Sequence, residues 1–170
     1  MYSGDTMNDL KKKLRIYLDN NLVEKSSFFG KFKNVFLEEE SIECYSDIDE
    51  FINKNEEQYN KFQTLLFNFI DKKNLKDSDV YNKVHIDRRL FSKIRSDKDY
   101  HPSKETVILL SIALELSENE LDELLESASY SLPKNNKYDL IIRFCFINKI
   151  FKITEINELL NDYECKLFNY

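Results

Sequence analysis

The feature that most restricts the fold is helical apolar spacing combined with a near absence of glycine and proline. The chain of 170 residues contains two Gly and two Pro, against roughly 7% and 5% in an average protein. Leu, Ile and Phe recur every three or four residues between polar side chains, which is typical of amphipathic helices. Because few residues suit positive φ angles, we expect turns of that kind to be rare. The sequence predicts an all-α protein.

Length and residue types narrow the class of protein. The chain suffices for one domain with an appendage. No apolar run approaches the roughly 20 residues of a membrane span, and MYSGDTMNDLKKK has no signal-peptide core. Cys44, Cys145 and Cys165 lack the spacing of a disulfide framework or zinc site, and His85 and His101 are interpreted as turn residues. We expect a cytoplasmic protein with no cofactor, no metal and no membrane partner.

Residues 1–57 are predicted to form an N-terminal helical segment with an acidic linker. The first helix spans Asn8–Glu24, so residues 1–6 are expected to be a leader and Met7 is a second candidate start. A short aromatic helix is expected within Ser26–Leu37, and the linker within Glu38–Asp49. Ser46 is a candidate cap for a helix through Ile52. The apolar positions of the first helix are Leu10, Leu14, Leu18 and Leu22.

Seven further helices are predicted after residue 57. Residues 58–132 are assigned to one domain, and residues 133–170, after the break at Pro133, to a C-terminal extension of two helices. No internal repeat is evident. The predicted helices are Gln58–Asn74, Asp77–Val84, Asp87–Ser96, a helix capped by Ser103 and running through Leu114, a helix capped by Ser117 with Glu120 completing a capping box, Tyr138–Ile150 and Thr154–Tyr163.

The segment Asp77–Ser96 has the apolar spacing of a helix-turn-helix. Such a motif needs apolar residues at interior positions to hold its two short helices at a fixed angle. Asp87 is a predicted N-cap for the second helix, Asp87–Arg95, and Leu90 is expected to point outward. The five interior positions are Val80, Val84, Ile86, Phe91 and Ile94. The outward basic or polar positions are Arg88, Arg89, Ser92 and Lys93, with Arg95 and Lys98 extending the basic edge.

Positive charge is concentrated around this motif. Residues 58–102 contain ten basic and six acidic side chains, whereas acidic residues outnumber basic ones by thirteen to eight before them and by twelve to seven after them. The formal net charge of the whole chain is −6. A basic region in an acidic chain is where a nucleic-acid contact would be expected. The other interpretation is a solvated helix face that pairs with neighbouring acids.

The region Gln58–Leu132 resembles the five-helix domain of phage-repressor-like, XRE-type DNA-binding proteins. The resemblance covers 75 of 170 residues and is carried by the motif and by HPSKETVILLSIALELSENELDELL, which has the Pro-Ser start and the Ser-capped acidic helix of that family. More narrowly, IDRRLFSKIRSDKDYHPSK resembles a group of largely uncharacterised bacterial proteins with variable N-terminal segments. This resemblance implies a DNA-binding regulator with Asp87–Arg95 as its recognition helix. Because one short recognition helix makes too few base contacts for useful specificity, we expect a homodimer.

Four residues depart from the family pattern. Tyr81 stands where the family usually has a small Ala, and His85 where it usually has Gly. Asp77 replaces a residue that commonly contacts a phosphate, and Asp79 adds a second carboxylate, unless both are helix caps. With the net charge of −6 and Leu90, these acids support an alternative function. In that alternative the same fold grips a protein, as an inhibitor or regulatory subunit of the anti-CRISPR or antitoxin kind.

Catalysis is not expected from this sequence. It contains no Gly-rich phosphate loop, no nucleophile elbow and no HExxH motif. No pair of carboxylates stands out from the many acidic residues. We therefore expect a binding protein that is not an enzyme.

Overall fold

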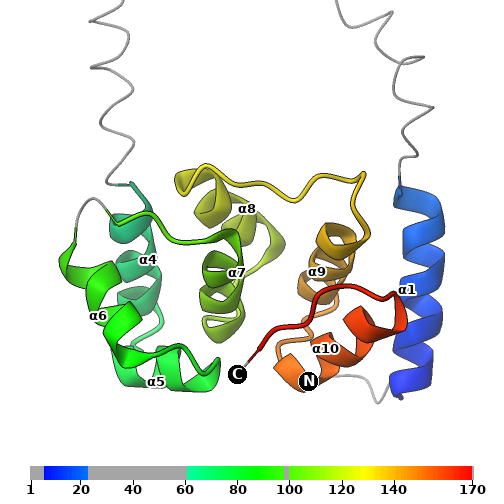
Figure 1. Ribbon diagram of the computed structural model, residues 1–170, viewed down its shortest axis with the longest axis horizontal. Coiled ribbons are helices and arrows are strands. Elements are labelled where there is room, and N and C mark those ends of the chain that lie inside the picture. The colour runs from blue at the N-terminus through cyan, green and yellow to red at the C-terminus, as the bar shows by residue number, and fades with distance from the viewer. Residues whose placement is uncertain (1–5, 23–60, 98–99, 170) are drawn as a thin grey trace, which may run out of the picture.

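The computed structural model of the protein describes residues 6–22, 61–97 and 100–169, and within these ranges it contains eight α-helices and no strand (Figure 1). The all-α prediction is confirmed for this part of the chain. The predictions for the aromatic helix, the acidic linker, Ser46 and Lys98 fall outside the described residues. The helices are α1 (Met7–Asn21), α4 (Lys61–Lys72), α5 (Asp77–Lys83), α6 (Arg88–Ser96), α7 (Lys104–Ala113), α8 (Glu118–Ser127), α9 (Lys137–Ile147) and α10 (Ile153–Asp162).

Helices α4 to α10 follow one another across the molecule, and α1 lies at the far side (Figure 1). Figure 1 shows α4, α5 and α6 at one side, α7 and α8 in the middle, and α9, α10 and α1 at the other side. Helix α5 contacts α6 and α7, α4 contacts α8, and α8 contacts α9, which also contacts α1 and α10. Buried apolar side chains from every helix form one continuous core. The N-terminal helix therefore packs against the C-terminal helices and lies away from α4 (Figure 1).

Helix α1 is attached to α9 and α10 by apolar and charged contacts. Leu10, Leu14 and Leu18 are buried, as their spacing predicted. The Tyr17 ring lies 5.6 Å from the Phe144 ring of α9. The remaining contacts are ionic: the Lys11 ammonium lies 2.8 Å from a Glu158 carboxylate oxygen and 3.1 Å from one of Asp162, both on α10.

Several of the described helices begin at side chains that cap their first turn. Ser103 and Ser117 are N-caps, and the Glu120 side chain accepts from the Ser117 N–H at 2.8 Å, which completes the expected capping box. Thr6 caps α1 in the same way, with Asp9 as its partner. The expectation that the leader includes residue 6 is therefore wrong, because Thr6 satisfies a backbone donor of the first turn.

Six helices end in a left-handed residue, although none of these residues is glycine. In each case its N–H and that of the next residue donate to carbonyls of the preceding turn, which is the Schellman arrangement. The residue that follows is apolar and belongs to the core or packs against it. The left-handed residues in the described ranges are Asn74, His85, Glu115, Ser129, Lys149 and Glu164, with φ angles between 48° and 59°.

This result corrects the expectation that positive φ would be rare. Gly4 and Gly30, the two glycines of the chain, lie outside the described residues, and other side chains take the left-handed positions. Burying the apolar residue that follows, such as Ile86 or Leu116, offsets the roughly 1–2 kcal/mol that a Cβ atom costs in this conformation. The scarcity of glycine thus predicted the helices correctly and their ends wrongly.

Ion pairs join α9 and the C-terminal segment to α7 and α8. The Asp139 carboxylate is 2% exposed, and the Lys104 ammonium donates to it at 2.6 Å. The Arg143 guanidinium donates to Glu118 at 2.7 Å and to both oxygens of Asp122 at 2.8 and 2.9 Å. A bidentate pair between arginine and a carboxylate fixes the relative orientation of the two side chains better than a single hydrogen bond does. Helix α9 is therefore fixed to the middle of the molecule by charge as well as by the core.

Replacing Lys149 by Gly should stabilise the protein. Lys149 is exposed and has a φ angle of 55°, and Gly adopts this angle without the Cβ clash. We expect a gain of about 1 kcal/mol in the free energy of unfolding, or about 2–4 °C in a thermal melt. Lys149→Ala removes the same charge but keeps Cβ, so it should give no gain. Equal melting temperatures for the two variants would contradict this account of the turn.

Removing a buried side chain of α1 should weaken the whole fold. Leu14 is fully buried, whereas Ile16 on the same helix is 54% exposed. Leu14→Ala should lower the free energy of unfolding in urea by about 2–5 kcal/mol, because it leaves a cavity against α9. The matched variant Ile16→Ala should change it by less than about 0.5 kcal/mol. A small effect of Leu14→Ala would mean that α1 does not share the core.

Candidate nucleic-acid interface

The pair α5 and α6 is held together by the five interior side chains that the sequence predicted. Val80, Val84, Ile86, Phe91 and Ile94 are all buried, at 7% exposure or less. They come from both helices and from the turn between them, so the relative orientation of α5 and α6 is fixed by packing. This orientation decides which side chains of α6 face outward.

The turn between the two helices is formed by residues 84–87. His85 has a φ angle of 55°, and its N–H and that of Ile86 donate to Asn82 and Tyr81 carbonyls at 3.3 and 2.9 Å. Tyr81 is half-buried, and its ring lies 5.6 Å from the Phe91 ring with the planes tilted by 52°. The Tyr81 ring therefore fills the space between the helices by an aromatic contact. A small residue at this position would allow the two helices to approach more closely.

Asp87 is the N-cap of α6, as predicted. Its carboxylate accepts from the Arg89 N–H at 2.6 Å. A carboxylate at a helix N-terminus is favoured by the exposed backbone donors and the helix dipole. It starts α6 so that the next two residues, Arg88 and Arg89, lie in the first turn.

One face of α6 is basic and open to solvent. Arg88, Arg89, Ser92 and Lys93 are all exposed, and we refer to these four residues as the α6 basic face. Neither Arg88 nor Arg89 forms an ion pair with a described residue, while the Lys93 ammonium lies 5.0 Å from the centre of the Tyr100 ring. The guanidinium groups of Arg88 and Arg89 can therefore donate to an acceptor from outside the described part of the chain.

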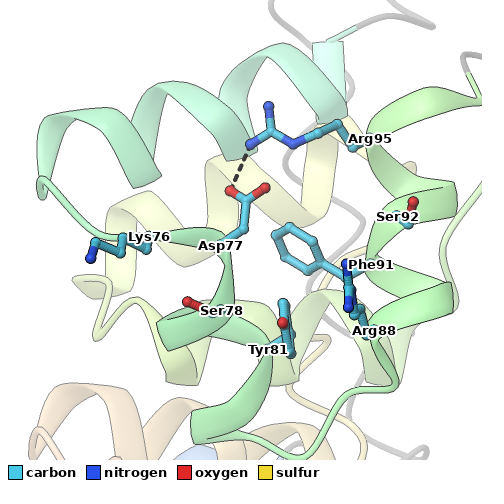
Figure 2. A pocket seen from close by; sticks show the side chains of 8 residues that line it. All are labelled: Lys76, Asp77, Ser78, Tyr81, Arg88, Phe91, Ser92 and Arg95. Carbon is cyan, nitrogen blue, oxygen red and sulfur yellow. Dashed lines mark hydrogen bonds and ion pairs between the residues drawn. The ribbon is translucent and has the colours of Figure 1, made fainter.

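Arg95 differs from the rest of this predicted contact set. Its guanidinium donates to the Asp77 carboxylate at 2.6 Å and lies 4.0 Å from the centre of the Phe67 ring on α4. Figure 2 shows the Asp77 carboxylate directed at Arg95 across the space between α5 and α6. Arg95 thus links α4, α5 and α6. The other predicted extension of the basic edge, Lys98, lies outside the described residues.

Leu90 is less exposed than the sequence predicted, and Asp79 caps a helix. Leu90 was expected to point outward, but it is only partly exposed and packs against the core, because it lies four residues before the buried Ile94 and so on the same side of α6. Asp79 serves as a helix cap, since its carboxylate accepts from the Lys76 N–H at 3.4 Å. The carboxylates of Asp77 and Asp79 therefore have different partners.

An open pocket lies between the start of α5 and the outer side of α6 (Figure 2). Its lining combines three basic side chains, three side chains with hydroxyl groups, one carboxylate and one phenylalanine ring. The lining residues are Lys76, Asp77, Ser78, Tyr81, Arg88, Phe91, Ser92 and Arg95. Sequence reasoning missed this pocket and the contribution of Phe67. The only available signal was the pair of opposite charges, Asp77 and Arg95, at the two ends of the motif.

Burial raises the pKa of several titratable groups of the molecule. It raises the pKa of the Cys145 thiol and of the Tyr138 hydroxyl well above their usual values. It also raises the pKa of Tyr100, which lies beside Lys93. The Cys145 thiol is therefore not a thiolate near neutral pH, and Tyr100 presents a neutral ring to the Lys93 ammonium.

Comparisons with protein-family models, curated proteins and solved structures found no match to this chain. In the described ranges, no helix is long and apolar enough to cross a bilayer. The same ranges contain no group of three His, Cys, Asp or Glu side chains that could hold a metal ion. Functional inference therefore depends on the geometry and charge of α5 and α6.

Loss of the Asp87 cap should loosen α6. Asp87→Ala leaves the Arg89 N–H without its acceptor and should lower the free energy of unfolding by about 1 kcal/mol in a urea titration. Asp87→Asn keeps an acceptor oxygen and should cost much less. If the two substitutions are equally destabilising, the negative charge of Asp87 matters more than its cap.

Proposed function

We propose that this protein is a sequence-specific DNA-binding regulator whose α5 and α6 form a helix-turn-helix of the phage-repressor-like type. The observation that carries the proposal is the α6 basic face: four neighbouring outward positions of one helix are exposed, and Arg88 and Arg89 have no acidic partner among the described residues. A solvated face of an acidic chain would be expected to use such charges in surface ion pairs, as Lys83 does with Glu115 and Lys152 with Glu155.

Recognition would follow from inserting α6 into a major groove. Arg88 and Arg89 carry the forked donors that match the O6 and N7 acceptors of guanine, and Ser92 is short enough to approach a base edge. Lys93 would contact a phosphate as a point charge. Arg95 is proposed to act indirectly, because its guanidinium is already engaged by Asp77.

Useful specificity would require two copies of the chain. One recognition helix reads only a few base pairs, so such proteins generally bind as dimers with half-sites about 34 Å apart. We therefore propose a homodimer on a two-fold symmetric site.

The alternative of a protein-binding inhibitor or regulatory subunit has lost one of its supports. Leu90 was its candidate anchor, and this side chain is partly buried against the core. The alternative retains the net charge of −6 and the Asp77 carboxylate beside the basic face. Leu90→Asp would test it poorly, since a charge placed against the core would disturb the fold as well as a partner contact.

The proposal predicts salt-dependent binding to duplex DNA. Fluorescence anisotropy of the full chain on a labelled duplex pool should show binding at about 50 mM salt that weakens steeply as salt rises. Arg88→Ala and Arg89→Ala should each cost about 1–3 kcal/mol of binding free energy, which is about 5- to 150-fold in affinity.

Lys134→Ala is the matched control for charge. Lys134 is an exposed cation between α8 and α9, so its removal changes net charge equally but leaves α6 intact. It should weaken binding by no more than about two-fold. No binding of any duplex by the folded protein at low salt, or equal losses for all three variants, would exclude α6 as the recognition helix.

A further inference from the structure

The Asp77–Arg95 pair closes one side of the pocket between α5 and α6. Asp77 is the first residue of α5 and Arg95 lies in the last turn of α6. The Arg95 guanidinium lies against the Phe67 ring and donates to the carboxylate. The Asp77 side chain is 36% exposed and that of Arg95 is 51% exposed. This contact is therefore made at the surface, where another anion can reach it.

The other groups around the pocket suit an oxyanion. Besides Asp77, the charged side chains that line it are Lys76, Arg88 and Arg95, and hydroxyl groups come from Ser78, Tyr81 and Ser92. Figure 2 shows Tyr81, Arg88 and Ser92 beside the space between Asp77 and α6, whereas the Lys76 side chain points away from them. The lining provides three cations and three hydroxyl groups for one carboxylate, a composition that favours a phosphate group of a nucleic-acid backbone.

We propose that Asp77 is an internal competitor of a nucleic-acid phosphate, which holds Arg95 in the free protein and so lowers affinity for DNA. This inference rests on the proposed function and adds a regulatory element to it. With Asp77 in place the pocket offers a phosphate less net positive charge and one cation that is already paired. With Asp77 neutralised, Arg95 is free to donate to a phosphate beside Arg88 and Ser92.

The strength of the Asp77–Arg95 contact fits a competitor. Partly exposed ion pairs contribute little to stability because water and salt screen them. The contact is therefore exchangeable at a small cost, whereas a buried pair such as Lys104–Asp139 would resist exchange. The Phe67 ring keeps the guanidinium in position when the carboxylate is removed, since cation–π attraction does not depend on Asp77.

Four variants of the full chain test the competitor. They are Asp77→Asn, Arg95→Gln, the double variant, and Asp79→Asn as a charge-matched control on the same helix that does not line the pocket. Asn at position 79 keeps an oxygen for the Lys76 N–H. Circular dichroism melts establish that each variant is folded. Binding to a labelled duplex of about 25 base pairs of mixed sequence is measured by anisotropy from about 50 to 200 mM salt.

The expected result is a gain that depends on Arg95. Asp77→Asn should bind about five-fold more tightly than the wild type, and the slope of log affinity against log salt should steepen by about 0.9, as one additional phosphate contact requires. The double variant should lose this gain. Asp79→Asn should show a smaller gain without the change of slope, because it removes only distant repulsion.

Other outcomes would overturn the inference in distinguishable ways. A gain that persists in the double variant would make Asp77 a simple source of repulsion, and weaker binding by Asp77→Asn would make it a residue that positions Arg95. Equal binding by the wild type and Asp77→Asn would contradict the role of Asp77 as a competitor but leave the proposed function unaffected. Absence of binding by all folded variants would remove both. Binding by Asp77→Asn alone would support the competitor strongly.

Discussion

The structure depends on one kind of turn, in which a left-handed residue ends a helix and the next residue enters the core. This turn occurs at the ends of α4, α5, α7, α8, α9 and α10. The backbone donors of the turn satisfy carbonyls of the last helical turn, and the apolar residue fixes the direction in which the chain leaves. In three cases the residue after the apolar one is the N-cap of the next helix. Four residues therefore join the helices in each of the pairs α4–α5, α5–α6 and α7–α8. The orientation of neighbouring helices therefore follows from local sequence, with burial of residues such as Ile86 and Leu116 stabilising each reversal.

The same turn limits what the α5–α6 pair says about function. Its connection is shared with pairs in the chain that lack a basic face, so the turn is a way of ending helices here and does not by itself indicate DNA binding. What distinguishes α6 is its outer surface. The helix carries four basic side chains and no acidic one, while α8, which follows the same kind of turn, carries five acidic side chains and no basic one. Two helices of similar construction thus present opposite charge, and a functional proposal has to be argued from side chains.

The sequence predicted what depends on periodicity and local capping, and failed where distant residues meet. The five interior positions of α5 and α6, the Asp87 cap and the Ser117 capping box were predictable because each depends on neighbours within a few residues. Packing of α1 on α9 was not, since apolar spacing shows that a helix has a partner but not which one. The Arg95 contacts were missed for the same reason: Phe67 lies 28 residues away in the sequence. Left-handed helix ends could not be predicted from glycine content, because the residues at these positions are Asn, His, Glu, Ser and Lys.

The net negative charge of the chain is compatible with the proposed role of the α6 basic face once the partners of the acids are considered. Glu118 and Asp122 bind Arg143, Asp139 binds Lys104, and Glu105 binds Lys166. These carboxylates hold α9 and the C-terminal segment against α7 and α8. Part of the negative charge is therefore neutralised locally by ion pairs that fix the helices. Beyond about one Debye length, roughly 8 Å in physiological salt, the remaining exposed acids are screened. Under the proposed function, a nucleic-acid phosphate approaching α6 would therefore sense Arg88, Arg89 and the Asp77–Arg95 pair far more than the formal charge of −6, so the exchange of that pair would have more influence on affinity than the net charge.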